Sequence, residues 1–137
     1  GAFFTTLGMR PLHGRFFGIE ATRPGEGESQ RVVLSERLWR RRYGATPNLT
    51  GQTILLNHRS CTVAGIARLD TAYPQACDFW IPLTFEPAAR NDYSSRVLEV
   101  VGRLREGVSA SAAEAEVQVL TAQLSGLMTG NWCRRIR

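Results

Sequence analysis

Arginine is the side chain with the clearest chemical potential in this sequence. All 17 basic residues of the 137 are arginine, against 12 acidic residues, so the formal net charge is +5. A guanidinium group forms paired hydrogen bonds with phosphate or carboxylate, which suggests an anion-binding surface. A genome whose codons favour arginine over lysine explains the same composition without any binding function. Net charge alone leaves both interpretations open.

The excess positive charge lies in the first half of the chain. Residues 1–68 contain ten arginines and four acids, whereas residues 69–137 contain seven arginines and eight acids. Five of the arginines fall within residues 31–44, and most of these lie on a predicted helix. The charge therefore marks one helix face and not the whole molecule.

The arginines of that helix separate into two groups on a helical wheel. Arg37, Arg40 and Arg41 fall on the polar face, where they form a candidate interaction patch. A solvated helix face is the simpler explanation of the same pattern. Arg42 falls between the apolar positions, so we expect it to lean inward. It then either pairs with a carboxylate, as a structural ion pair, or reaches water past a packed aliphatic stem.

Groups suited to catalysis or metal binding are sparse. His13 and His58 fall in a turn and at a hairpin tip, without a neighbouring nucleophile. The sequence has no Cys-x-x-Cys pair, no metal-ligand spacing and no phosphate-binding glycine loop. We therefore expect no catalytic residue, no metal site and no cofactor. A disulfide bridge between Cys61 and Cys77 is one alternative, and two buried thiols are the favoured one. With Cys133 the number of cysteines is odd, so at most one bridge forms within the chain.

Local signals predict the elements that position these side chains. Ser35 and Gly44 are the N-cap and stop of one helix, and Ser111 with Glu114 predicts a capping box for the last helix. Asn57 joins two β-rich runs as part of a hairpin turn. The predicted elements are a helical turn over 2–7, helices over 35–43 and 111–128, and strands over 31–34, 53–56, 61–67, 79–81 and 96–105.

The order of these elements predicts an α+β fold. Strands bunch in the middle of the chain and helices flank them, which indicates a mainly antiparallel sheet with a central hairpin and helices packed on one face. We expect one domain over residues 1–130, followed by an unstructured tail over 131–137. No stretch approaches 18 consecutive apolar residues, so no transmembrane helix is predicted.

An ordered set of short motifs resembles the MacB-like periplasmic core domain of FtsX-type ABC transporter permeases. No single motif is specific, but their order is, and together they cover about residues 3–128. The segments that carry the resemblance are Phe3-Phe4, Leu7-Gly8, Arg10-Pro11, Gly14-Arg15, Phe17, Leu34-Ser35, Leu38-Trp39, Arg41-Arg42-Tyr43-Gly44, Thr62-Val63-Ala64-Gly65-Ile66, Trp80-Ile81-Pro82-Leu83 and Val100-Val101-Gly102-Arg103-Leu104.

The resemblance implies a function without catalysis. Such a domain lies outside the cytoplasmic membrane of its permease and passes motion driven by a separate ATPase to substrates or partners. The chain is then a periplasmic interaction module that contacts a protein or a transported molecule. Compared with the family, upstream strands are missing and the tail does not match, so we expect a fragment of a longer domain.

A fragment with missing strands also leaves an open sheet edge, which predicts a homodimer formed by strand pairing. The alternative function is a small stand-alone basic module that binds an anionic polymer such as nucleic acid. The element order matches no known nucleic-acid-binding motif, so nucleic acid is the less favoured partner.

Overall fold

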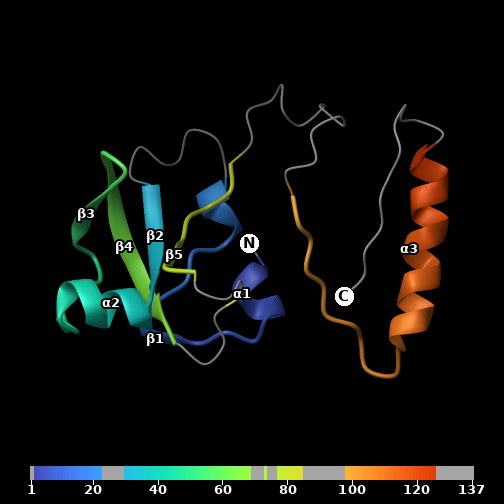
Figure 1. The fold of residues 1–137 in the computed structure, drawn as a ribbon, viewed down its shortest axis with the longest axis horizontal. Coiled ribbons are helices and arrows are strands. Elements are labelled where there is room, and N and C mark those ends of the chain that lie inside the picture. Colours follow the sequence, from blue (N-terminus) through green and yellow to red (C-terminus); the bar gives the residue numbers. More distant parts are fainter. Residues whose placement is uncertain (1, 23–29, 69–72, 74–76, 85–97, 126–137) are drawn as a thin grey trace. The chain divides into compact units, whose positions relative to one another are not determined.

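The computed structural model describes residues 2–22, 30–68, 73, 77–84 and 98–125. The chain forms two compact units, residues 1–86 and 87–137. The elements of the described residues, labelled in Figure 1, are α1 (Phe3–Thr6), β1 (Pro11–Gly14), η1 (Ile19–Thr22), β2 (Gln30–Ser35), α2 (Glu36–Tyr43), β3 (Thr53–Leu56), β4 (Arg59–Ala67), β5 (Phe79–Trp80) and α3 (Ala110–Ser125).

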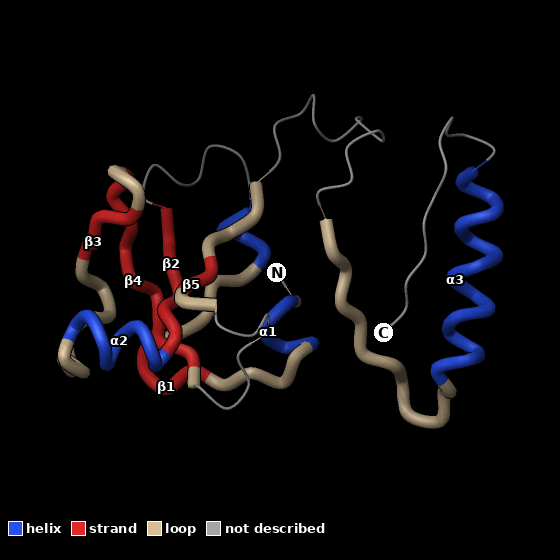
Figure 2. Tube along the Cα trace, in the orientation of Figure 1, coloured by secondary structure: helices blue, strands red, loops and turns tan. Residues whose placement is uncertain are grey.

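The strands of the first unit make one mixed sheet of five strands in the described part of the chain (Figure 2). The order is β1-β4-β2-β5, and β3 also pairs with β4. β4 pairs antiparallel with β1 and β3, and β5 pairs antiparallel with β2. β2 and β4, however, are parallel. The α+β class with a mainly antiparallel sheet is confirmed, because three of the four pairings among the described strands are antiparallel. The sheet is mixed and not purely antiparallel, because its central pairing is parallel.

The parallel pairing follows from the segment that connects β2 to β4. Parallel neighbours cannot be joined by a tight turn and need a crossover, usually through a helix. Here α2 and β3 form the crossover, so the chain returns to β2 in the same direction. The sequence shows a helix between strands, but it does not show which strand lies beside which.

Two short strands share one side of β4. β3 pairs with Arg59–Thr62 and β1 pairs with Gly65–Ala67, so they lie end to end along the same strand. β1 was not predicted, because the Arg10-Pro11 signal is compatible with either a turn or an extended segment. His13, expected in a turn, therefore belongs to a strand.

A close approach of two backbones fixes the position of β1. Gly14 and Gly65 are register partners in the β1–β4 pairing. A Cβ atom on Gly65 would lie 2.6 Å from the carbonyl oxygen of Arg15 and 2.9 Å from that of His13. Both obstacles are backbone atoms and cannot swing aside. This crossing therefore requires glycine.

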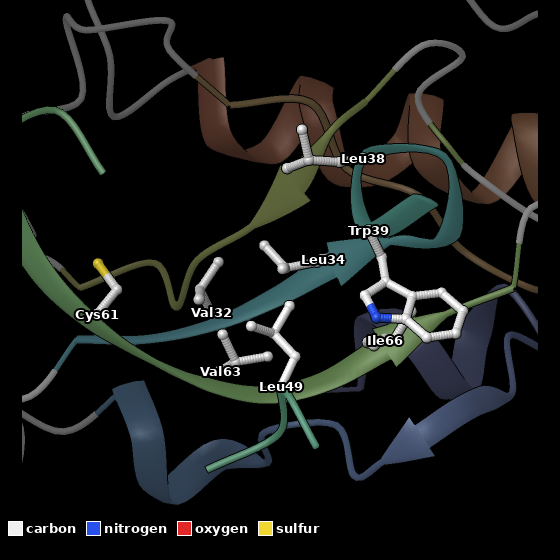
Figure 3. Close-up of a cluster of buried hydrophobic side chains, with 8 residues drawn as sticks. All are labelled: Val32, Leu34, Leu38, Trp39, Leu49, Cys61, Val63 and Ile66. Atoms are coloured by element: carbon white, nitrogen blue, oxygen red, sulfur yellow. The ribbon is translucent and has the colours of Figure 1, made fainter. Parts of the chain in front are cut away.

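The sheet face beneath α2 holds the larger hydrophobic cluster (Figure 3). Alternate residues of a strand point to the same face, so Val32 and Leu34 of β2 both reach it. Leu38 and Trp39 of α2 close the cluster from above. The indole nitrogen of Trp39 donates to the carbonyl oxygen of Thr46 at 2.9 Å, which satisfies its polar edge. The cluster consists of Val32, Leu34, Leu38, Trp39, Leu49, Cys61, Val63 and Ile66.

The opposite face of the sheet is covered by the first residues of the chain. Val33 and Ala67 point to this face, and Phe4 of α1 packs against them. The Phe4 ring contacts Trp80 edge to face at 6.0 Å between centroids. α1 and α2 therefore lie on opposite faces. The expectation that the helices share one face is wrong. Successive side chains of β2 point to opposite faces of the sheet and are apolar on both, so each face must be covered by another element.

Local sequence signals correctly predict α2 and the hairpin. The Ser35 hydroxyl accepts a hydrogen bond from the backbone nitrogen of Leu38 at 3.1 Å, and Gly44 ends the helix with φ +57°. At the hairpin tip, Asn57 and His58 have φ values of +47° and +63°. Two successive residues with positive φ match the twist of the flanking strands, which explains this two-residue turn.

The second unit differs more from the predictions. Residues 98–105, expected in a strand over 96–105, make no strand among the described residues. Their alternation gives an apolar face, but a strand also needs a partner to complete its hydrogen bonds. α3 is confirmed as a helix, yet its cap is Ser109, whose hydroxyl accepts from the backbone nitrogen of Ala112 at 3.2 Å. The capping box at Ser111 is therefore wrong by two residues.

Candidate interaction surface

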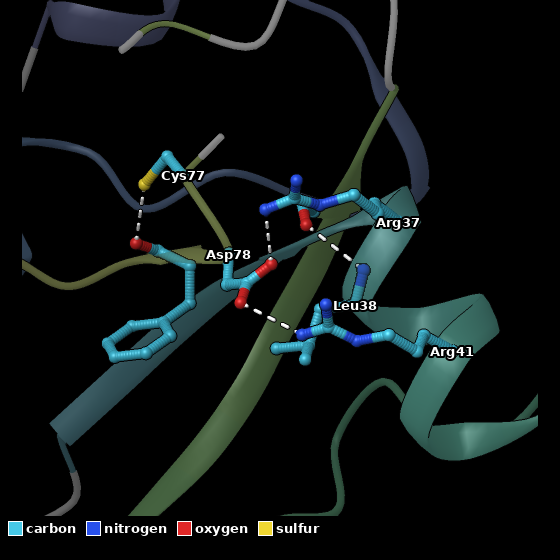
Figure 4. A network of polar contacts seen from close by, with 7 residues as sticks. Arg37, Leu38, Arg41, Cys77 and Asp78 are labelled. Atoms are coloured by element: carbon cyan, nitrogen blue, oxygen red, sulfur yellow. Dashed lines mark hydrogen bonds and ion pairs between the residues drawn. The ribbon is translucent and has the colours of Figure 1, made fainter. Parts of the chain in front are cut away.

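Two arginines of α2, Arg37 and Arg41, converge on one carboxylate of a neighbouring segment (Figure 4). Asp78 precedes β5. One of its carboxylate oxygens accepts a hydrogen bond from Arg37 at 2.8 Å, and the other accepts one from Arg41 at 3.1 Å. The backbone carbonyl of Asp78 also accepts a hydrogen bond from the nitrogen of Ser35 at 2.9 Å. Asp78 thus joins the helix to the sheet through both its side chain and its backbone.

The electrostatic environment of Asp78 favours its charged form. The hydrogen bond from Arg37 holds the pKa of the Asp78 carboxyl below its ordinary value, and the nearby charges of Arg37 and Arg41 act in the same direction. Partial burial opposes this shift but does not reverse it. The carboxylate is therefore ionised at neutral pH and keeps two guanidinium groups in place.

Arg40 is held by a contact within the helix. Its Nε and Nη2 atoms both donate to one carboxylate oxygen of Glu36, at 2.9 and 2.8 Å. The guanidinium also lies over the Trp39 ring, with 5.7 Å between its central carbon and the ring centroid. A pair of this spacing is exposed and contributes only a few tenths of a kcal/mol to helix stability, about 0.3–0.5. Its main effect is to orient Arg40.

Arg42 does not lean inward. Its side chain is exposed, and it forms no ion pair with any residue that the structure describes. Arg42 occupies the last turn of α2, beside the left-handed cap at Gly44. A long side chain at the end of a helix reaches water easily. The helical wheel ignores this end effect and assigned Arg42 to the apolar stripe.

Together these side chains form the α2 basic surface, which we define as Arg37, Arg40, Arg41 and Arg42. Four guanidinium groups against the carboxylates of Glu36 and Asp78 leave a net charge of +2. Arginine stays protonated at all relevant pH values, so these side chains are suited to anionic groups and not to proton transfer. The spacing of four residues between Glu36 and Arg40 is visible in the sequence. Asp78 lies 41 residues from Arg37, and no sequence pattern indicates that the two side chains pair.

The other titratable side chains considered in the sequence, the histidines and cysteines, are either packed in the fold or exposed. The His13 ring packs edge to face against Trp39, with centroids 5.0 Å apart, and His58 is exposed at the hairpin tip. No disulfide joins Cys61 to Cys77, and burial raises the pKa of both thiols. Across the residues that the structure describes, no group of three or more metal-ligating side chains gathers. Cys133 lies outside the described residues.

An open hollow of about 350 Å³ lies on the first unit, near the tip of the hairpin. It is the feature of this unit that sequence reasoning missed altogether, because three separate strands or their extensions contribute to it. Its lining consists of Leu56, Asn57, Arg59, Cys61, Phe79 and Ile81.

No helix in the described ranges is both long enough and apolar enough to span a bilayer.

Comparison with solved structures relates the fold to permease domains. The periplasmic region of MacB from Actinobacillus actinomycetemcomitans superposes with a TM-score of 0.60 at 20% identity, over 91% of this chain and 54% of that one. A domain of a putative permease protein from Porphyromonas gingivalis superposes with a TM-score of 0.52 at 19% identity, over 89% of this chain and 55% of that one. At these identities the likeness concerns the fold.

Sequence relatives point in the same direction. The macrolide export ATP-binding/permease protein MacB of Burkholderia thailandensis is 30% identical over 128 residues, which are 90% of this chain. The protein of the same name from Burkholderia cenocepacia is 30% identical over 129 residues, or 91% of this chain. The chain spans about a fifth of the length of these relatives, 19% and 18% respectively.

The profile of the MacB-like periplasmic core domain matches residues 1–120, which is most of the chain. This domain is a non-catalytic type that belongs to ABC transporter permeases and lies in the periplasm. The chain therefore belongs to the family of MacB-like periplasmic core domains.

Proposed function

We propose that this chain is a periplasmic interaction module of an ABC-type permease, which contacts a protein partner or a transported molecule and carries out no catalysis itself. The observation that supports this function is the family match over residues 1–120. The arginine-based chemistry of the α2 basic surface agrees with it, because a surface of permanent cations suits recognition more than bond making.

The α2 basic surface, centred on Arg37, Arg40 and Arg41, is the proposed contact. Asp78 and Glu36 hold these side chains in defined positions, which reduces the conformational entropy that is lost when a partner binds. Carboxylates on a protein partner complement the remaining net charge of +2 and match guanidinium geometry. An acidic protein surface is therefore the expected partner.

Several features of the parent protein are part of the same proposal. The relatives are ATP-binding/permease proteins, so the parent of this chain is expected to work with an ATPase outside the matched region. The names of the relatives also state macrolide export, which makes export of a small molecule the first activity to examine. We keep the single domain over residues 1–130 with a tail at 131–137 as a proposal; residues 126–137, which include the whole tail, lie outside the described ranges.

A homodimer also remains a proposal. The outer edges of β3 and β5 lack a neighbouring strand among the described residues. Such edges pair readily with a second copy. Light scattering at high protein concentration that gives a dimer mass supports this state, whereas a monomer mass at every concentration refutes it.

Site-specific photo-cross-linking tests the interaction module. The chain is produced in the periplasm of its source bacterium with a photoreactive phenylalanine derivative in place of Arg42, and the adducts are identified by mass spectrometry. Arg42 is exposed and belongs to the proposed surface. We expect an adduct with a component of the same transport system. Leu55 is the matched control position, because it is 63% exposed and lies on β3.

Charge reversal completes the experiment. The substitution Arg40→Glu reverses one charge of the surface at a position with a 62% exposed side chain, and circular dichroism checks that the variant is folded. The adduct from position 42 should then decrease several-fold, while background adducts from position 55 stay constant. If positions 42 and 55 give identical adducts, or if Arg40→Glu does not change the yield of the adduct from position 42, α2 is not the contact.

A further inference from the structure

The hollow near the hairpin tip lies on the part of the sheet face that α2 leaves uncovered. In Figure 3, Cys61 and Val32 lie at one end of the cluster, and Leu38 and Trp39 of α2 lie at the other. The hollow involves the Cys61 end, where no helix of the first unit packs on the described strands. Its position thus follows from the short length of α2, which has eight residues.

Strand pairing explains why apolar side chains gather in the hollow. Register partners point to the same face of a sheet. Leu34 is paired with Phe79, so Phe79 shares the face on which α2 packs. Leu56 is paired with Arg59, and Arg59 lies two residues before Cys61, so these side chains share that face as well.

The rim of the hollow is polar and positively charged. Arg59 is exposed and forms no ion pair with any residue that the structure describes. No carboxylate is among the lining residues that the structure describes, and the amide of Asn57 adds further hydrogen-bonding groups. Among the described residues, the charge of Arg59 is therefore not compensated by a carboxylate, in contrast to that of the α2 basic surface.

This combination of three apolar side chains, Leu56, Phe79 and Ile81, with the exposed guanidinium of Arg59 selects a particular ligand chemistry. Pockets for small ligands are mostly apolar with few polar groups that fix orientation, and a volume of about 350 Å³ is in their usual range. We propose that the hollow binds a free monomeric amphiphile, with its hydrocarbon chain against Leu56, Phe79 and Ile81 and its carboxylate on Arg59. This inference does not depend on the permease assignment or on the α2 basic surface.

Isothermal titration calorimetry of the full 137-residue chain tests the proposal. The probe is decanoate below its micelle concentration, and decyltrimethylammonium is the matched cationic amphiphile. We expect saturable binding of one decanoate per chain and weaker binding of the cation. Vesicles with anionic lipid form a separate arm, and binding to vesicles without binding of monomeric decanoate contradicts a monomer site.

Two pairs of variants separate the hollow from general effects of charge and apolarity. Ile81→Asp changes an exposed wall residue, and Leu55→Asp makes the same change on the other face of β3; the two side chains are 50% and 63% exposed. Ile81→Asp should weaken decanoate binding roughly fivefold to tenfold, and Leu55→Asp should leave it unchanged. Circular dichroism confirms that each variant is folded.

The second pair concerns the charge. Arg59→Gln should weaken decanoate binding about two- to fivefold, which is the effect of one exposed ion pair, and should leave the cationic amphiphile unaffected or bound more tightly. Arg42→Gln removes an equally exposed charge on α2 and should change nothing. The proposal is overturned if decanoate shows no saturable binding, if Ile81→Asp binds like the wild type, or if the two arginine variants behave alike.

Discussion

The glycine at the β1–β4 crossing offers the sharpest test of the architecture. In the variant Gly65→Ala, the new Cβ atom would lie 2.6 Å from the carbonyl oxygen of Arg15, 2.9 Å from that of His13 and 3.0 Å from the nitrogen of Arg15. Ordinary contacts of a Cβ atom start near 3.4 Å. All three obstacles are backbone atoms, so β1 must move away from β4 to relieve the overlap.

The cost of that movement has two parts. Overpacking of a closely fitted site costs about 1–3 kcal/mol. The displaced strand also weakens its ladder and the hydrogen bond from Arg15 to Ala64, which is 3.0 Å long, at about 1 kcal/mol for each bond lost. We therefore expect the free energy of unfolding to fall by about 3 kcal/mol. In a unit of this size, such a loss lowers Tm by roughly 12–24 °C.

Urea unfolding followed by tryptophan fluorescence measures this loss, because Trp39 and Trp80 lie in the two clusters on opposite faces of the sheet. The matched control is Gly102→Ala, since a Cβ atom at Gly102 meets nothing within 4 Å. The control should change the free energy of unfolding by less than about 0.5 kcal/mol. A loss below about 0.5 kcal/mol for Gly65→Ala as well would refute the close approach of β1 to β4.

Three further predictions concern single side chains. Ser35→Ala removes the hydroxyl that caps α2 and should lower the free energy of unfolding by about 1 kcal/mol in the same urea assay, and an unchanged free energy would contradict the cap. The folded-state pKa of Asp78 is depressed, so this carboxylate contributes fully to stability above the ordinary aspartate pKa, and the contribution is lost as pH falls through the folded-state pKa. Asp78→Asn should therefore flatten this part of the profile of stability against pH. An unchanged profile would contradict the stabilising role of the Asp78 carboxylate. Cys61 lines the hollow but is only 1% exposed, and burial raises the pKa of its thiol. Iodoacetamide at pH 8 should therefore modify Cys61 only after unfolding, as measured by peptide mapping, and rapid labelling of the native chain would show that the thiol is not buried.

The elements that could be predicted are those specified by neighbouring residues. Ser35 and Gly44 bound α2 because a hydroxyl cap and a left-handed glycine act within one turn of the helix. Asn57 and His58 form the hairpin tip for the same local reason, since both tolerate positive φ. Gly8, which follows α1, likewise has a positive φ of +67°.

The features that could not be predicted depend on partners far away in the sequence. The parallel pairing of β2 with β4 requires knowledge of which strands are neighbours, and alternation in one strand does not contain it. The strand expected over 96–105 failed in its described part because an apolar alternation without a pairing strand does not make a ladder.

In the candidate site, too, the features set by neighbouring residues could be predicted and those set by distant residues could not. The outward positions of Arg37, Arg40 and Arg41 follow from helical geometry, and all three side chains are at least 40% exposed. Their common partner Asp78 belongs to a segment next to β5 and could not be inferred. The prediction for Arg42 was wrong in orientation, because helical wheels treat the last turn like the middle of a helix.

Binding to DNA most directly tests whether this chain is a protein-interaction domain or a basic module for polyanions. Fluorescence anisotropy with a labelled 20-base-pair duplex is measured for the full chain across about 50 to 200 mM salt. Three of the four arginines of the α2 basic surface are already paired with carboxylates of this chain. We therefore expect no saturable binding at physiological salt and a change in log K of at most about one per unit of log salt concentration. Saturable binding with a slope of about three or steeper would contradict the account and identify an anionic polymer as the partner.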